Sequence, residues 1–86
     1  MEQSRLPNSF KKYRRIAGLT QVKVAAILNL KHTSAICHWE KGDYLPSIKQ
    51  LFQLCIIYNA QPEQLLGEFI QSLRTELFAH DEPIIN

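Results

Sequence analysis

Cysteine, methionine, tryptophan and glycine are scarce in this chain of 86 residues, which contains two, one, one and three of them respectively. The two cysteines, Cys37 and Cys55, lack the C-x-x-C spacing of common metal and redox sites, so we expect free thiols. No apolar run is long enough to span a bilayer, and no charged segment followed by an apolar run opens the chain. These absences indicate neither a membrane span nor secretion, and a cytoplasmic location is expected.

The motifs of common enzyme sites are also missing. The sequence has no Gly-rich phosphate loop, no nucleophile elbow and no metalloprotease helix signature. Three residues could be considered as metal ligands, namely His32, Cys37 and His38. On a helix, however, a separation of five residues places the first two about 140° apart, so one ion cannot easily gather all three. We therefore predict no enzyme, no metal site and no cofactor.

What the sequence does contain is a globular composition and an uneven charge. Apolar residues make up 45% of the chain, which is too much for a disordered protein and fits one small domain without a separate sensor domain. Through Lys49 there are nine Lys or Arg and three Asp or Glu, a net charge of +6; from Gln50 onward one Arg faces five acids, a net charge of −4. A basic amino-terminal part predicts a surface that faces phosphates, and ordinary solvated faces are the alternative.

The segment from Thr20 to Glu40 predicts two short helices joined by a tight turn. The Thr20 hydroxyl can cap the first helix, and Asn29 suits a turn residue with positive φ. The second helix is expected near residues 32–40, starting at about His32–Thr33, with Ile36 and Trp39 buried. Its outward side chains are then Thr33, Ser34, Cys37 and His38. Small polar residues outside and an apolar edge inside are what a helix in the DNA major groove requires.

This segment resembles the helix-turn-helix of the lambda-repressor/Cro-like family, also called xenobiotic-response-element-type regulators. The matching residues span roughly residues 10 to 66: Gly18–Gln21, Ala25, Ile27–Leu28, Ile36, Trp39–Gly42, Pro46–Ser47, Leu51, Leu54 and Leu65–Leu66. The chain departs from the family pattern in two ways. The stretch between Leu28 and Ile36 is one residue longer than the commonest form, and Asn29 replaces the usual Gly. Both departures bear on which residue begins the recognition helix.

The expected fold is all-α, a five-helix lambda-repressor-like domain over residues 9–66. A flexible amino-terminal arm is predicted over residues 1–8, a C-terminal amphipathic helix over residues 67–80 and a tail over residues 81–86. Apolar spacing predicts that the inner faces of the helices carry Phe10, Tyr13 and Ile16, then Val24, Ile27 and Leu28, and then Ile48, Leu51, Leu54, Cys55 and Tyr58.

The resemblance also implies which residues meet DNA. Thr33, Ser34 and His38 are the candidates for reading base edges, and Cys37 is a further one. Five residues are candidates for phosphate contacts: Gln21, Lys31, Lys41, Lys23 and Lys11. For each of these candidates the alternative is an ordinary solvated side chain. For Cys37 a redox role is a further alternative. The family pattern pairs Arg14 with Glu40, which would fix the recognition helix to the scaffold; a direct phosphate contact is the alternative for Arg14.

The function implied is a sequence-specific regulator of transcription, a repressor, that binds double-stranded DNA with a near-palindromic operator as a homodimer. Apolar residues that a monomer does not obviously need are assigned to the dimer interface: Phe52, Ile56, Phe69, Ile70, Leu73 and Leu77. Alternatively, the terminal helix folds back and caps its own core. An antitoxin-type protein, which inhibits a protein partner and autoregulates its operon, is the alternative function. An RNA-binding or pure interaction module is disfavoured, because the recognition helix lacks outward stacking aromatics.

Overall fold

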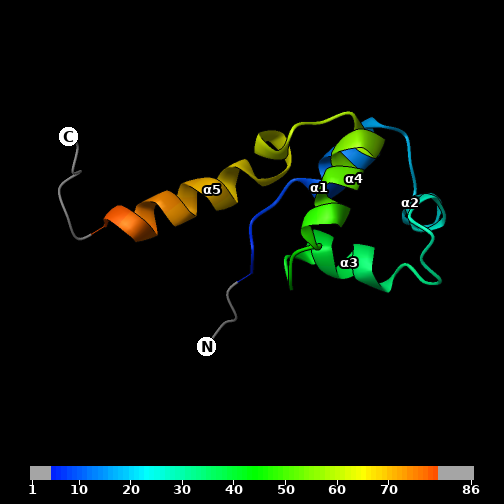
Figure 1. Ribbon diagram of the computed structural model, residues 1–86, viewed down its shortest axis with the longest axis horizontal. Coiled ribbons are helices and arrows are strands. Elements are labelled where there is room, and N and C mark those ends of the chain that lie inside the picture. Colours follow the sequence, from blue (N-terminus) through cyan, green and yellow to red (C-terminus); the bar gives the residue numbers. More distant parts are fainter. Residues whose placement is uncertain (1–4, 80–86) are drawn as a thin grey trace.

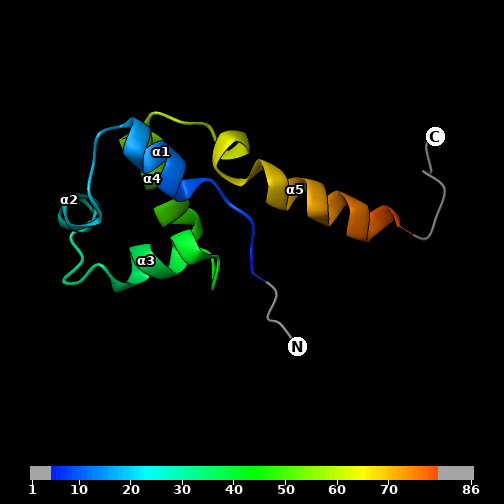
Figure 2. The same ribbon diagram turned by 180° about the vertical axis from the view of Figure 1, so that it is seen from behind.

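The computed structural model describes residues 5–79, which form five helices and no strand. The helices are α1 (Phe10–Ile16), α2 (Gln21–Ile27), α3 (Ser34–Lys41), α4 (Ile48–Tyr58) and α5 (Pro62–Phe78). In Figures 1 and 2 the first four helices cluster together, and α5 extends away from them. The predicted all-α fold is confirmed. Within this part of the chain, no helix combines the length and the apolar character needed to cross a membrane.

Local sequence explains where α2 begins and ends. The Thr20 hydroxyl accepts a hydrogen bond from the backbone N–H of Lys23 at 3.1 Å, as a helix cap does. Gly18 (φ 75°) and Asn29 (φ 63°) adopt the left-handed conformation and turn the chain before and after this helix. The helix α3 begins at Ser34, slightly later than predicted, because residues 30–33 are used by the lengthened turn.

The starts of α4 and α5 follow equally local rules. Ser47 and Gln50 form a reciprocal capping box at α4, in which each side chain bonds the backbone N–H of the other residue at 3.1 Å. Asn59, with φ 52°, ends α4. Pro62 then occupies the first turn of α5, where its missing N–H has no intrahelical partner to lose.

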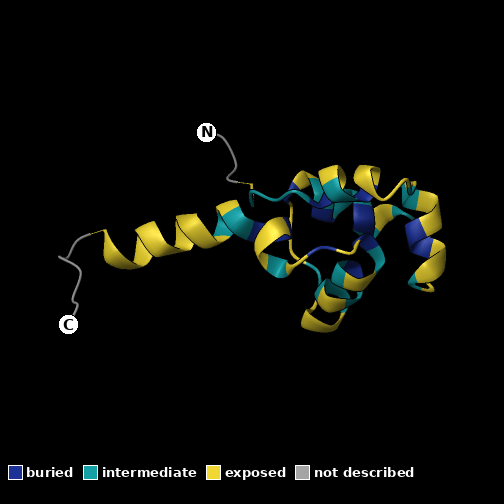
Figure 3. Ribbon diagram, turned by 90° about the horizontal axis from the view of Figure 1, so that it is seen from above, coloured by how far each residue is buried: buried dark blue, intermediate teal, exposed yellow. Residues whose placement is uncertain are grey.

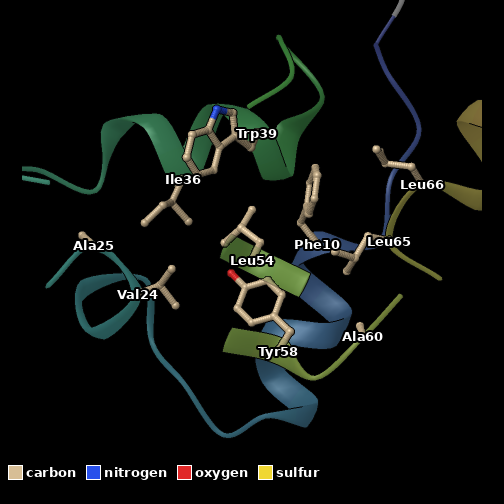
Figure 4. Close-up of a cluster of buried hydrophobic side chains, with 10 residues drawn as sticks. All are labelled: Phe10, Val24, Ala25, Ile36, Trp39, Leu54, Tyr58, Ala60, Leu65 and Leu66. Carbon is tan, nitrogen blue, oxygen red and sulfur yellow. The ribbon is translucent and has the colours of Figure 1, made fainter. Parts of the chain in front are cut away.

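One hydrophobic core joins the helices (Figure 4). Its buried residues within the described range are Phe10, Val24, Ala25, Ile36, Trp39, Leu54, Tyr58, Ala60, Leu65 and Leu66. Leu54 and Leu65 are fully buried, at 0% exposure. The core therefore holds α3 against α1 and α2, holds α1 against α4, and extends into the first turn and a half of α5.

Three residues predicted to face this core are exposed instead, at 66%, 50% and 75%: Ile16, Ile27 and Ile48. In α1, Arg14 shares the buried side with Phe10, because a step of four residues rotates by only about 40° beyond a full turn, whereas a step of six to Ile16 points away. Ile27 and Ile48 lie at the edges of the apolar stripes of α2 and α4. They are outside the narrow part of the stripe through which a short helix contacts the core.

In residues 5–8, where a flexible arm was predicted, the segment before α1 bonds to the end of α3. The Leu6 N–H donates to the Gly42 carbonyl at 2.8 Å. The Asn8 side-chain amide donates to the carbonyls of Leu6 and Trp39 at 3.0 and 3.1 Å. The bond from Leu6 pairs the carbonyl of Gly42, one of the groups that the end of a helix leaves without an intrahelical partner. Residues 1–4 of the predicted arm lie outside the described residues.

The helix α5 is interrupted at Leu66. Leu66 has non-helical dihedrals (φ −127°, ψ 26°) inside this helix, near the boundary where a separate helix over residues 67–80 was expected. Beyond the half-buried Phe69, all residues from Ile70 to Ala79 are exposed (Figure 3). This stretch does not cap the core, since the break at Leu66 directs it away. His80 and the predicted tail, residues 81–86, lie outside the described residues.

Candidate nucleic-acid interface

The helix α3 presents one face to the core and the opposite face to solvent. Ile36 and Trp39 are only 1% and 3% exposed and anchor the inner face. By the helical period, Ser34, His38 and Lys41 lie on the opposite side. The residues expected to read bases are one exposed side chain, Ser34, and three half-buried ones, Thr33, Cys37 and His38. Thr33 directly precedes the helix. The structure thus places all four on or beside the outward part of one short helix.

A buried ion pair attaches α3 to α1. The Nε of Arg14 donates to Oε2 of Glu40 at 2.6 Å, and its Nη2 donates to Oε1 at 3.1 Å. The side chains are only 10% and 4% exposed. The remaining terminal nitrogen, Nη1, donates to the Leu19 carbonyl at 2.9 Å. The hydrogen bond to Glu40 raises the pKa of Arg14 above its ordinary value, although burial opposes this shift. This geometry fits a structural Arg14 and not a solvent-facing side chain available to a phosphate.

The same carboxylate also binds α2. The side-chain amide of Gln21 donates to Oε1 of Glu40 at 3.0 Å. Glu40 therefore accepts hydrogen bonds from α1 and α2 while it belongs to α3. Because three helices meet at one carboxylate, the orientation of α3 is tied to the start of α2, where Gln21 is the first helical residue.

A second polar cluster, which was not predicted, also lies at the carboxyl end of α3. Gly42 ends the helix in the left-handed conformation (φ 81°), and the N–H of Asp43 donates back to the His38 carbonyl at 3.0 Å. This turn brings the Asp43 carboxylate to 2.8 Å from Nδ1 of His38. Arg5 lies 3.3 Å from the same carboxylate. The ring of Tyr44 stacks on His38, with centroids 5.4 Å apart. The sequence signal for this arrangement was the Gly42-Asp43 pair, typical of a helix end at which the chain reverses.

A family model described as helix-turn-helix matches residues 10–65. The chain belongs to this helix-turn-helix family. The match starts at the first residue of α1 and ends one residue before the break at Leu66, so it covers the packed helices and leaves the exposed part of α5 outside. It confirms the resemblance to lambda-repressor/Cro-like proteins and makes this a DNA-binding domain of a regulatory family. No curated protein and no solved structure matches the chain significantly.

In this helix-turn-helix domain the phosphate candidates come from several segments. Lys11 lies on α1, Lys23 on α2, Lys31 in the turn and Lys41 at the end of α3, and all four are exposed. Gln21 is half-buried and already bonded to Glu40. An exposed lysine can reach a phosphate on a flexible stem, whereas Gln21 would approach one only at a position that Glu40 fixes.

The apolar residues assigned to a dimer interface lie outside the core. Phe52 and Ile56 on α4 are 52% and 79% exposed, and Ile70, Leu73 and Leu77 on α5 are 38%, 40% and 72% exposed. Phe69 differs, because it is half-buried and packs against the core. A shallow hollow of about 640 Å³ lies where α4 meets α5, and it is lined by Phe52, Cys55, Ile56, Asn59, Ala60, Gln61 and Pro62. Large apolar side chains thus line an open surface of the helix-turn-helix unit.

The residues weighed as metal ligands are not gathered into a site. Among residues 5–79, no three His, Cys, Asp or Glu side chains are grouped so that they could hold a metal ion. Cys37 and Cys55 are free thiols, each half-buried. Burial, followed by the charge of Glu63, raises the pKa of the Cys55 thiol, which fits a small core-facing residue and not a reactive one.

Proposed function

We propose that this helix-turn-helix protein is a sequence-specific transcriptional regulator, a repressor, that binds a near-palindromic operator as a homodimer through α3. The observation that carries the proposal is the way α3 is held. Ile36 and Trp39 fix its inner face in the core, and the buried Arg14–Glu40 pair fixes its carboxyl end. A helix held this firmly can present the same side chains to the major groove each time the protein binds, which base reading requires.

The proposed division of labour follows the position of each side chain. Thr33, Ser34, Cys37 and His38 meet base edges from the outward part of α3. Exposed lysines and the amide of Gln21 contact phosphates, which sets the register of the protein on DNA without reading sequence. None of the base-reading residues forms the bidentate contacts of Arg or Asn, so each contributes modest discrimination. Repression then requires only that the bound protein covers its DNA site. The proposed location is the cytoplasm, where the operator would be.

A two-fold dimer is part of the proposal, because one short helix reads only a half-site. The exposed side chains of Phe52 and Ile56, with the apolar residues of α5, supply a surface whose burial against a second copy would be favourable. Two such copies would place their α3 helices in successive major grooves about one DNA turn apart.

Selection of bound sequences from a random pool of double-stranded DNA tests this function. We expect enrichment of two inverted half-sites whose centres lie about 10 base pairs apart. Ser34→Ala should relax the preference at one position of each half-site, whereas Ser72→Ala, which removes an exposed hydroxyl on α5, should leave the selected sequence unchanged. If the wild-type protein enriches no sequence, the proposed function is wrong.

A second candidate function rests on the exposed stretch of α5, residues 70–79. An antitoxin-type protein would use this helix to bind and inhibit a protein partner, while the helix-turn-helix regulates its own operon. Purification from the native host distinguishes the two. A stoichiometric partner protein that is lost with Leu73→Glu would favour the antitoxin, and a pure homodimer would favour the repressor.

A further inference from the structure

The ring of His38 is held in one orientation by the turn after α3. Its Nδ1 lies 2.8 Å from Oδ2 of Asp43, and its face stacks on Tyr44 with an angle of 25° between the ring planes. Turning the ring over would place a carbon atom beside the carboxylate and lose the hydrogen bond. Nδ1 therefore faces the turn, and Nε2 points away from it. In the described part of the chain no other group hydrogen-bonds this ring, and the side chain is 44% exposed.

The proton in this hydrogen bond belongs to the ring. An ionised carboxylate can only accept a hydrogen bond, so Nδ1 must donate. The hydrogen bond from His38 is the main cause that holds the pKa of Asp43 below its ordinary value. Desolvation opposes it, and the charges of Arg5 and Lys41 are smaller causes that also lower the pKa. Asp43 thus stays ionised near neutral pH. A neutral imidazole that carries its one proton on Nδ1 has only a lone pair on Nε2.

We infer that Asp43 is a positioning residue that makes His38 a hydrogen-bond acceptor in the major groove, so that this position of α3 prefers a base with an amino group. The inference rests on the proposed function. In the major groove, amino groups are offered by cytosine at N4 and by adenine at N6. Without the Asp43 carboxylate, the tautomer with its proton on Nε2 becomes accessible. His38 could then donate to guanine or thymine acceptors, and the preference would shift.

Nuclear magnetic resonance of the imidazole nitrogens tests the first half of the inference on the free protein. At a pH where the same spectra show a neutral ring, wild-type His38 should carry its proton on Nδ1. In Asp43→Ala the form protonated on Nε2 should become substantially populated. Asp43→Leu, which also lacks an acceptor, provides a second variant at this exposed position. A wild-type ring protonated on Nε2, or a tautomer that both variants leave unchanged, would overturn the inference.

Selection from a random DNA pool tests the second half. Asp43→Ala should shift one base position in each half-site from cytosine or adenine toward guanine or thymine, by about fivefold in relative affinity. His38→Ala should abolish the preference at that same position. Loss of the Asp43 charge also removes repulsion from phosphates, but that effect strengthens all sequences alike. Glu68→Ala, the removal of an exposed carboxylate on α5, is the control and should shift no base position.

The two readouts separate failure of the inference from failure of the proposed function. If wild-type protein selects no DNA sequence, the proposed function fails, whatever the tautomer. If wild-type protein selects a sequence but His38→Ala changes no position, or Asp43→Ala changes a different position from His38→Ala, the function stands and the inference is wrong.

Discussion

Arg14 on α1 and Glu40 on α3 meet through two hydrogen bonds of 2.6 and 3.1 Å, although 26 residues separate them in the chain. Their side chains are almost fully removed from solvent. Gln21, at the start of α2, reaches the same carboxylate. The three helices nearest the proposed DNA surface are therefore joined at one charged group, and the setting of α3 depends on it.

Breaking this pair should be costly. Arg14→Ala leaves a buried carboxylate without its main partner, so we expect a loss of about 3 kcal/mol in the free energy of unfolding and weaker DNA binding. The double variant Arg14→Ala/Glu40→Ala should lose less than the sum of the two single losses. Thermal and urea unfolding measure the stability of the two single variants and of the double variant. Arg15→Ala, at an exposed position of α1, is the control. Strict additivity would show that the pair contributes no coupling.

Two glycines should respond to alanine in opposite ways. Gly42 has φ 81°, and a Cβ there would overlap the backbone of Leu6. Gly42→Ala should therefore destabilise the protein by more than about 1 kcal/mol and detach residues 5–8 from α3. Gly67 lies in α5 with open space around it, so Gly67→Ala should stabilise the protein by roughly 0.5–1 kcal/mol. Unfolding in urea measures the change in stability for both variants. Equal effects of Gly42→Ala and Gly67→Ala would contradict this account of Gly42.

The salt dependence of DNA binding should identify phosphate contacts. Each neutralised phosphate contributes a slope of about −0.9 to the logarithm of affinity against the logarithm of salt concentration. Lys41→Ala should therefore flatten the slope by roughly one unit and weaken all sequences alike. Arg74→Ala, which removes an exposed charge on α5, should leave the slope unchanged. An unchanged slope for Lys41→Ala would mean that Lys41 does not contact a phosphate.

Assembly should depend on the exposed apolar residues of α4 and α5. Ile56→Glu and Leu73→Glu should each give a folded monomer that binds DNA poorly, because a charge at an interface opposes association without disturbing the core. Ile16→Glu introduces the same kind of charge at a position that is 66% exposed and outside this surface, so it should remain dimeric. Sedimentation and thermal melting separate these cases. A wild-type protein that sediments as a monomer at tens of micromolar without DNA would contradict the stable dimer.

The carboxyl group of Asp43 should titrate below its ordinary pKa of 3.8. The hydrogen bond from His38 is the larger cause and the charge of Arg5 a smaller one, so His38→Ala should raise the Asp43 midpoint more than Arg5→Ala does. Because the pKa is lowered by folding, the stability linked to it is present above the unfolded-state pKa and is lost as the pH falls through the folded-state value. Carbon-13 titration of the carboxyl group measures the midpoints; the reverse order of the two variants would assign the main role to Arg5.

The helix boundaries and turns could be predicted closely because their causes are local. A cap such as Thr20, a left-handed turn residue such as Asn29 and a first-turn proline such as Pro62 act on backbone groups only a few residues away. The burial of Ile36 and Trp39 could be predicted equally well, since a strong helical period marks the inner face of a helix. The Arg14–Glu40 pair was expected only through the family resemblance, because no local rule joins residues on two separate helices.

The sequence by itself therefore determined the five helices, the turn around Asn29 and the inner face of α3. Only the tertiary structure decided that residues 5–8 bond to the end of α3, that Asp43 and Tyr44 hold His38, and that α5 leaves the core after Phe69. Apolar spacing predicts an apolar stripe on a helix but not the width of the part that is buried. This is why Ile16, Ile27 and Ile48 were predicted to be buried although they are exposed. Contacts between distant segments depend on where the packed core places each helix, and this placement is a property of the whole chain and not of any short stretch.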